Sequence, residues 1–196
     1  LSLHDALPIC EPTAFYENFH KAALVHRDIE LIKGKRGSGY FYPFMTMPEL
    51  RGRLSMVCHL YDGALRKCEE MGLASHLPSN LHDMMQRRTE YKPVIDKFVA
   101  MAAPMDGEGF FAVSGSGMWE ECAYEHAGNV ILEVNPNLPR FPGALRIPLD
   151  RVDRIVEVDV PATVYDVRST PTETDLKIGA YAAEFVHDGD CIQLGL

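Results

Sequence analysis

The sequence has few cysteines, and their spacing gives them no common role. Its 196 residues contain five, which are odd in number, widely scattered and without a C-x-x-C pair: Cys10, Cys58, Cys68, Cys122 and Cys191. Such a distribution argues against both a disulfide framework and a zinc knuckle. We therefore interpret most of them as buried thiols and predict no bound metal.

Long hydrophobic runs and basic stripes are also lacking. No apolar run reaches the roughly 18 residues that a membrane-spanning helix needs, and no secretory leader is recognisable. A formal net charge of -9 opposes binding to the phosphates of nucleic acid. The sequence thus indicates a cytoplasmic protein with neither nucleic acid nor membrane as a partner. An anionic ligand would need a local basic spot.

Two catalytic motifs are incomplete. The glycines of residues 34–39 have the separation of a phosphate-binding P-loop, but Tyr40 and Phe41 stand where that loop has lysine and a hydroxyl residue. Around Ser116, Ser114 and Met118 replace the two glycines of a serine hydrolase's G-x-S-x-G elbow. The first segment is better explained as a surface loop, and a serine nucleophile is disfavoured.

Residues 76–83 bring two histidines and an aspartate together, which raises the alternative of a metal site. Zinc-binding histidines on a helix stand four residues apart, whereas His76 and His82 are separated by six and Pro78 interrupts the segment. We interpret the segment as a loop that could line a pocket.

The stretch that organises the chain is residues 97–140. Residues 98–102 and 129–134 read as buried strands, and each runs into a polar loop that contains proline, residues 103–109 and 135–140. In open α/β sheets, ligands bind outside the carboxyl ends of the strands. The two loops are therefore expected to converge on one pocket, although ordinary turns would explain the spacing as well.

The remaining elements follow from periodicity and from turn residues. We expect a helix from Pro12, a strand at 28–32, a mostly helical segment at 51–71, a strand at 110–113, a helix at 119–127, strands at 145–147 and 154–160, a helix capped by Thr172 or Thr174, and a strand at 191–196.

The same loops carry a resemblance to a known family. The chain reads Ala103-Pro104-Met105-Asp106 after one strand and Asn135-Pro136-Asn137-Leu138-Pro139-Arg140 after the other, and it ends with Gln193-Leu194-Gly195-Leu196. This pattern resembles the N-terminal domain of the acetyl-CoA hydrolase/transferase family, which includes acetate, butyrate and 4-hydroxybutyrate CoA-transferases. The family usually has Ser-Pro-Met-Asp and Asn-Met-Pro-Arg at the first two places, so the departures are mild.

The resemblance implies an α/β fold of the CoA-transferase (NagB/RpiA-like) type, with a mostly parallel sheet flanked by helices. It also implies transfer of CoA between an acyl-CoA and a short-chain carboxylic acid through a glutamyl-CoA thioester. The catalytic glutamate would lie beyond Leu196, so no catalytic residue is expected in this chain. Coenzyme A would be a substrate, with no permanently bound cofactor. The substrate-binding residues would be Pro104, Met105, Asp106, Gly109, Ser114, Asn135, Asn137, Pro139, Arg140, Gln193 and Gly195.

Other interpretations remain open. Arg140 could bind a carboxylate substrate, or it could be a surface ion-pair partner. The chain could also belong to an acetyl-CoA hydrolase, to a non-catalytic module that binds CoA or acids, or to a sugar-phosphate isomerase on the same fold.

The sequence also carries an expectation about the limits of the native chain. Residues 1–9 look like a translated sequencing adapter and are interpreted as a non-native leader. Residues 10–196 would then be an N-terminal CoA-transferase domain truncated at both ends. A full-length protein is expected to be a homo-oligomer.

Overall fold

The computed structural model describes residues 11–32, 41–59, 61, 63–80, 83, 86, 89–90, 94–113, 120–162 and 170–192. Its contacts divide the chain into two compact units, Leu1–Thr163 and Val164–Leu196. Each unit is described by itself.

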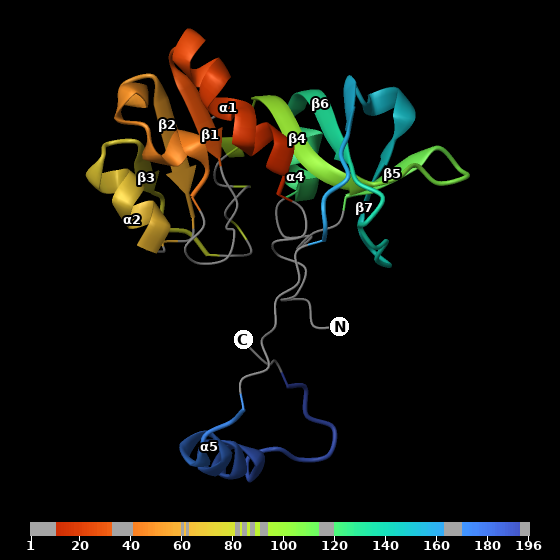
Figure 1. Ribbon diagram of the computed structural model, residues 1–196. Coiled ribbons are helices and arrows are strands. Elements are labelled where there is room, and N and C mark those ends of the chain that lie inside the picture. The colour runs from red at the N-terminus through yellow and green to blue at the C-terminus, as the bar shows by residue number, and fades with distance from the viewer. Residues whose placement is uncertain are drawn as a thin grey trace. The chain divides into compact units, whose positions relative to one another are not determined.

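The first unit begins with a small parallel sheet. Strands β1 (Ile29–Ile32), β2 (Leu54–Cys58) and β3 (Ala74–His76) pair in that order, all in parallel (Figure 1). Helix α1 (Thr13–Val25) precedes β1, the short 3-10 turns η2 (Pro43–Thr46) and η3 (Pro48–Leu50) precede β2, and α2 (Gly63–Glu70) connects β2 to β3. The predicted αβ unit at the start of the chain is confirmed.

The prediction of a mostly helical segment over residues 51–71 is wrong in its first half. Leu54, Met56 and Cys58 are buried and alternate with more exposed neighbours, which is the period of a strand. Pairing with β1 on one side and β3 on the other outweighs the local helix propensity of this segment. Among the described residues of this segment, only α2 is helical. Gly72 follows its end with φ +70°, in agreement with the predicted stop.

Aromatic side chains fill the space beneath α1. Phe44 is completely buried, and its ring centroid lies 5.2 Å from that of Phe19 and 5.8 Å from that of Tyr16. Tyr42 stacks on Phe44 with ring centroids 5.9 Å apart. These rings anchor α1 to the 3-10 turn η2.

A five-stranded mixed sheet makes up the rest of the first unit. Its order is β7 (Leu145–Pro148), β5 (Phe110–Val113), β4 (Ile95–Ala103), β6 (Ala127–Val134) and β8 (Arg154–Glu157). Strands β4, β6 and β8 are parallel, while β5 runs antiparallel to both β4 and β7. The short helix α4 (Glu120–Glu125) precedes β6. The α/β class and the predicted strands are confirmed, except that β8 ends at Glu157 rather than at residue 160.

Helix α1 is capped by a residue far away in the sequence. Its N-cap is Pro12, which makes no side-chain capping bond. Instead, the carboxylate of Glu133 on β6 accepts the backbone N–H of Ala14 at 3.1 Å and that of Phe15 at 2.5 Å. Glu133 is only 2% exposed, and this burial raises the pKa of its carboxyl group, with the two N–H donors opposing the shift. Glu133 thus ties α1 to the five-stranded sheet.

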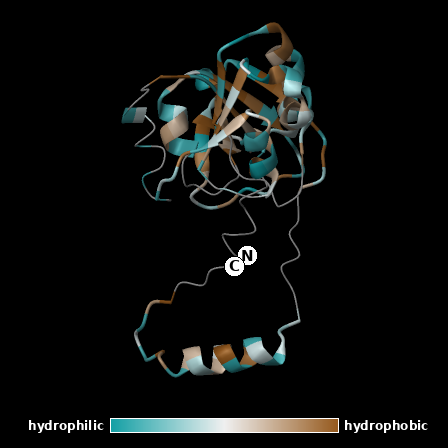
Figure 2. Cartoon of the chain, turned by 90° about the vertical axis from the view of Figure 1, so that its left-hand side faces the viewer, coloured by the Kyte–Doolittle hydropathy of each residue, from teal (hydrophilic) through white to brown (hydrophobic). Residues whose placement is uncertain are grey.

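The second unit contains helix α5 (Glu173–Ala183). Thr172 caps it through a reciprocal capping box with Asp175, which confirms one of the two predicted caps. Its apolar side chains are exposed, with Leu176 at 63% and Ile178 at 61%. The colouring of Figure 2 shows that this helix carries both hydrophobic and hydrophilic residues. The first two residues of the strand predicted at 191–196 are not in a strand, and the other four lie outside the described residues. Within the described part of the chain, no helix is long and apolar enough to cross a membrane.

Candidate functional site

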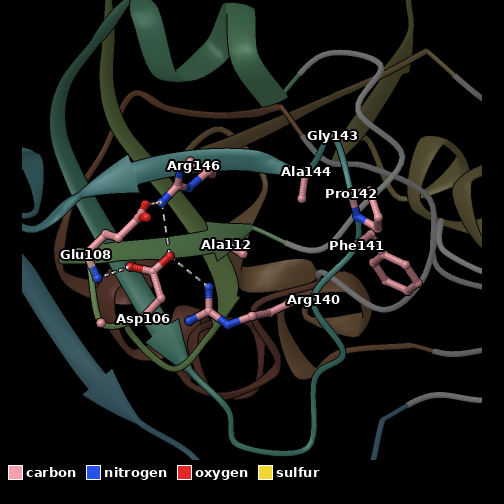
Figure 3. A pocket seen from close by; sticks show the side chains of 10 residues that line it. Asp106, Glu108, Ala112, Arg140, Phe141, Pro142, Gly143, Ala144 and Arg146 are labelled. Atoms are coloured by element: carbon pink, nitrogen blue, oxygen red, sulfur yellow. Dashed lines mark hydrogen bonds and ion pairs between the residues drawn. The ribbon is translucent and has the colours of Figure 1, made fainter.

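The two loops that follow β4 and β6 meet, as the strand-end argument predicts. Arg140, from the loop after β6, places Nη1 3.3 Å from Oδ2 of Asp106 in the loop after β4. Its Nη2 donates a hydrogen bond to the carbonyl oxygen of Pro104. Figure 3 shows the Arg140 side chain directed towards Asp106. One arginine therefore bridges the two segments that carry the family resemblance.

Asp106 organises the turn between β4 and β5. Its Oδ1 accepts the backbone N–H of Phe110 at 2.8 Å and that of Glu108 at 3.0 Å. Gly109 has φ +86°, a conformation that favours glycine in this turn. The N–H of Phe110 has the largest influence on the pKa of Asp106, and it lowers it. The N–H of Glu108 and the side chain of Arg146 also lower this pKa, whereas burial raises it. The net result is a pKa below the ordinary value for an aspartate. Asp106 is therefore an ionised carboxylate that holds the turn and both arginines.

A second arginine reaches the same carboxylate. Nη2 of Arg146 lies 3.1 Å from Oδ2 of Asp106 and 2.6 Å from Oε2 of Glu108, and its guanidinium carbon lies 4.2 Å from the centroid of the Phe110 ring. Arg146 and Glu108 were not among the predicted site residues. Arg146 arrives there because β7 pairs antiparallel with β5, which sets it opposite Ala112. Sequence spacing carries no signal for that register.

These residues line a pocket of about 510 Å³. In Figure 3 the charged side chains gather on one side and the turn after Arg140 forms the other. The lining consists of Asp106, Gly107, Glu108, Ala112, Arg140, Phe141, Pro142, Gly143, Ala144 and Arg146. Two acidic and two basic side chains therefore share a wall with apolar groups.

The two predicted asparagines brace the loop after β6. Asn135 is completely buried; its Nδ2 donates to the carbonyl oxygen of Val160 at 2.9 Å, and its Oδ1 accepts the N–H of Asn137 at 3.1 Å. Nδ2 of Asn137 donates to Oδ1 of Asp159 at 2.8 Å. Strand β8 stops early because its partner strand β6 ends at Val134, opposite Glu157. Both amides are directed at residues 159–160, and neither lines the pocket.

The other predicted site residues do not line the pocket or lie outside the described residues. Pro104, Met105 and Pro139 are exposed on the two loops, and Gly109 lies in the turn after Asp106. Ser114, Gln193 and Gly195 lie outside the described residues, as do residues 34–39 of the rejected phosphate loop.

The histidine-containing segment contacts His59 twice, since the Ser79 hydroxyl lies 2.8 Å from Nδ1 of that residue. Nε2 of His76 lies 3.3 Å from the carbonyl oxygen of His59, while His82 lies outside the described residues. Among the residues that the structure describes, no group of three His, Cys, Asp or Glu side chains is arranged to hold a metal ion.

Replacing Asp106 by asparagine should lower the melting temperature in a pH-dependent way. Because the folded-state pKa of Asp106 is depressed, its contribution is fully present above the ordinary value of 3.8 and is lost as the pH falls through the depressed value. Thermal unfolding of both proteins between pH 2 and 7 should show a gap that is constant at neutral pH and closes in acid. A gap that stays the same below pH 3 would contradict the assignment.

Comparisons with known proteins identify the family of this chain. Residues 55–164 match the family model "Acetyl-CoA hydrolase/transferase N-terminal domain". Succinyl-CoA:cyclohexane-1-carboxylate CoA transferase of Geobacter metallireducens is 35% identical over 131 residues, which cover 66% of this chain and 29% of that protein. Butyryl-CoA:acetate CoA-transferase of Anaerostipes caccae is 29% identical over 137 residues, 68% of this chain and 31% of that protein.

A solved structure extends the similarity to nearly the whole chain. RipA from Yersinia pestis superposes with a TM-score of 0.76 at 26% identity, covering 97% of this chain and 46% of RipA. The chain thus spans under half of that structure and matches about a third of the length of its curated relatives. On the family match over residues 55–164, the chain belongs to the acetyl-CoA hydrolase/transferase family and carries its N-terminal domain.

Proposed function

We propose that this chain forms one wall of the substrate site of a CoA-transferase that moves CoA between an acyl-CoA and a short-chain carboxylic acid. The observation that carries the proposal is the bridge from Arg140 to Asp106 and Pro104, because it joins the two loops in which the family resemblance resides. The relatives from Geobacter and Anaerostipes, both named as CoA-transferases, support the reaction class.

The chemistry would proceed by covalent exchange. A glutamate of a second domain attacks the acyl-CoA thioester, expels the CoA thiolate and forms an acyl-glutamyl anhydride. The thiolate then attacks the glutamyl carbonyl, which releases the first carboxylate and leaves a glutamyl-CoA thioester. The incoming acid repeats these two steps in reverse, so that a new acyl-CoA forms and the glutamate is regenerated. Covalent catalysis of this kind divides one difficult transfer into easier ones.

The residues of this chain would bind and position. The turn anchored by Asp106 and the loop braced by Asn135 present the pocket wall. The arginines provide positive charge for the carboxylate of the acid or for the phosphates of CoA. A guanidinium is suited to this task because its planar fork can donate two parallel hydrogen bonds to one carboxylate or phosphate.

The test is a chimera in which this chain replaces the matching N-terminal part of the Geobacter relative. We expect the folded chimera to form new acyl-CoA from succinyl-CoA and a panel of acids (acetate, butyrate and cyclohexane-1-carboxylate), measured by chromatography of the thioesters. The 196-residue chain alone should show no CoA-transferase activity, because the nucleophile is assigned to the other domain.

Three outcomes would count against the proposal in different ways. Turnover by the chain alone would place the nucleophile within it. Release of free CoA by the chimera without a new thioester would favour a hydrolase. A chimera that elutes as a folded protein but binds no acyl-CoA would refute the assignment of the pocket wall.

A further inference from the structure

Arg146 and Glu108 form an exposed ion pair at the pocket described above. The Glu108 side chain is 74% exposed and that of Arg146 is 48% exposed, whereas Asp106, their common neighbour, is only 24% exposed. Exposed ion pairs contribute little to stability because water screens them and both side chains must be ordered. The contact between Arg146 and Glu108 is therefore easily exchanged for another.

The two carboxylates that contact Arg146 are held differently. Asp106 is fixed through two backbone N–H groups and through Arg140. Within the described residues, the side chain of Glu108 is bonded only to Arg146, and it stands on the turn next to Gly107 and Gly109. Glu108 can therefore turn into solvent without disturbing Asp106.

The two arginines also differ in which guanidinium nitrogens already donate hydrogen bonds. Both terminal nitrogens of Arg140 are used, one by Asp106 and one by the carbonyl of Pro104. Both described hydrogen bonds of Arg146 use Nη2, and its guanidinium packs over the Phe110 ring. Such stacking orients the planar fork for an oxyanion, which a guanidinium binds with two parallel bonds.

The net charge of the pocket also depends on the position of the Glu108 side chain. With Glu108 in place, two guanidinium groups face two carboxylates. When Glu108 turns away, two guanidinium groups face Asp106 alone, and the pocket becomes positive beside the apolar wall of residues 141–144. This is the local basic spot that an anionic ligand needs in a chain of net charge -9.

We infer that Glu108 occupies the place of an oxyanion of the ligand, a carboxylate or a phosphate, and that Arg146 binds this oxyanion when Glu108 turns away. The inference rests on the proposed function for the ligand's identity, since both short-chain acids and acyl-CoA carry such groups. Glu108 then acts as an internal competitor that excludes weak anions and sets the affinity for the correct one.

The experiment is a titration of the 196-residue chain with acetate and, separately, with inorganic phosphate, followed by backbone amide chemical shifts of residues 106–110. Glu108→Gln removes the competitor and should tighten binding about twofold to fivefold, the range that an exposed ion pair allows. Arg146→Gln should weaken binding by at least as much, and Arg146→Lys, which keeps the charge but loses the fork, should fall between it and the wild type. A preference for acetate identifies the acid as the source of the oxyanion, and a preference for phosphate identifies CoA.

Matched controls separate a specific site from general charge. Glu125→Gln and Arg154→Gln change the net charge equally at exposed positions outside the pocket lining, and both should leave the dissociation constant unchanged. The inference is overturned if neither anion shifts the amides of residues 106–110, if Glu108→Gln leaves the affinity unchanged, or if the controls change it as much. An inactive chimera with the expected titration would refute the proposed function and leave the oxyanion site standing.

Discussion

Replacement of Glu133 by alanine is expected to destabilise the protein by about 2–3 kcal/mol, because two N–H groups of the first turn of α1 lose their acceptor. Pro12 cannot take over, since its side chain has no hydrogen-bonding group. A loss of this size is a large part of the 5–15 kcal/mol that typically stabilises a domain. Urea denaturation followed by circular dichroism measures it.

The control is Glu157→Ala, which removes an exposed acid from the neighbouring strand β8 and should change the free energy of unfolding by less than about 0.5 kcal/mol.

The pH dependence of stability gives a second test of the role of Glu133. Burial raises the pKa of Glu133, so between its ordinary value of 4.5 and the raised value the native state keeps a proton that the unfolded chain has released. Stability should therefore fall as the pH rises through this window. This decline should be absent in the alanine variant; equal slopes would disprove the role of Glu133.

Replacement of Asn135 by alanine is expected to cost about 2–3 kcal/mol and to disturb the pocket as well. The buried amide donates to the carbonyl of Val160 and accepts the N–H of Asn137. Without it, that N–H loses its acceptor, and the carbonyl keeps only the bond from Nδ2 of Asn137. Because Arg140 belongs to the same loop, amide shifts of residues 106–110 should change together with the unfolding free energy.

Two further variants of the asparagines make this test specific. Asn129→Ala removes an exposed amide at the other end of β6, whose described bond is local, and should be nearly neutral. Asn135→Asp keeps the acceptor but turns the donor into a buried carboxylate facing the Val160 carbonyl, so it should be at least as harmful at neutral pH as alanine. Equal stability of Asn135→Ala and Asn129→Ala would return Asn135 to the status of an ordinary loop residue.

The meeting of the two loops could be predicted because it depends on a rule about strand ends. Residues 98–102 and 129–134 are apolar enough to be recognised as buried strands, and parallel neighbours must end at the same edge. Arg140 and Asp106 follow those ends directly. The convergence of the loops needed no knowledge of side-chain conformations, whereas the ion pair between Arg140 and Asp106 was not predicted.

The parts that escaped prediction depend on distant partners. Strand β2 looks helical from its own residues, and only pairing with β1 and β3 decides otherwise. Arg146 reaches Asp106 through the antiparallel register of β5 and β7, which links residues more than thirty positions apart. The same limitation concealed Glu133, which reads as one polar interruption in a buried strand.

The cap that Glu133 provides also bears on the order of folding. It joins residues 119 positions apart, so the entropy of closing that long loop must be lost before either hydrogen bond can form. A 13-residue helix that begins without a local cap is marginal by itself in water. The first turn of α1 therefore becomes protected from hydrogen exchange only once β6 has formed and packed beside it. During folding, the exchange of the Ala14 and Phe15 amide hydrogens thus reports when the helix docks on the sheet.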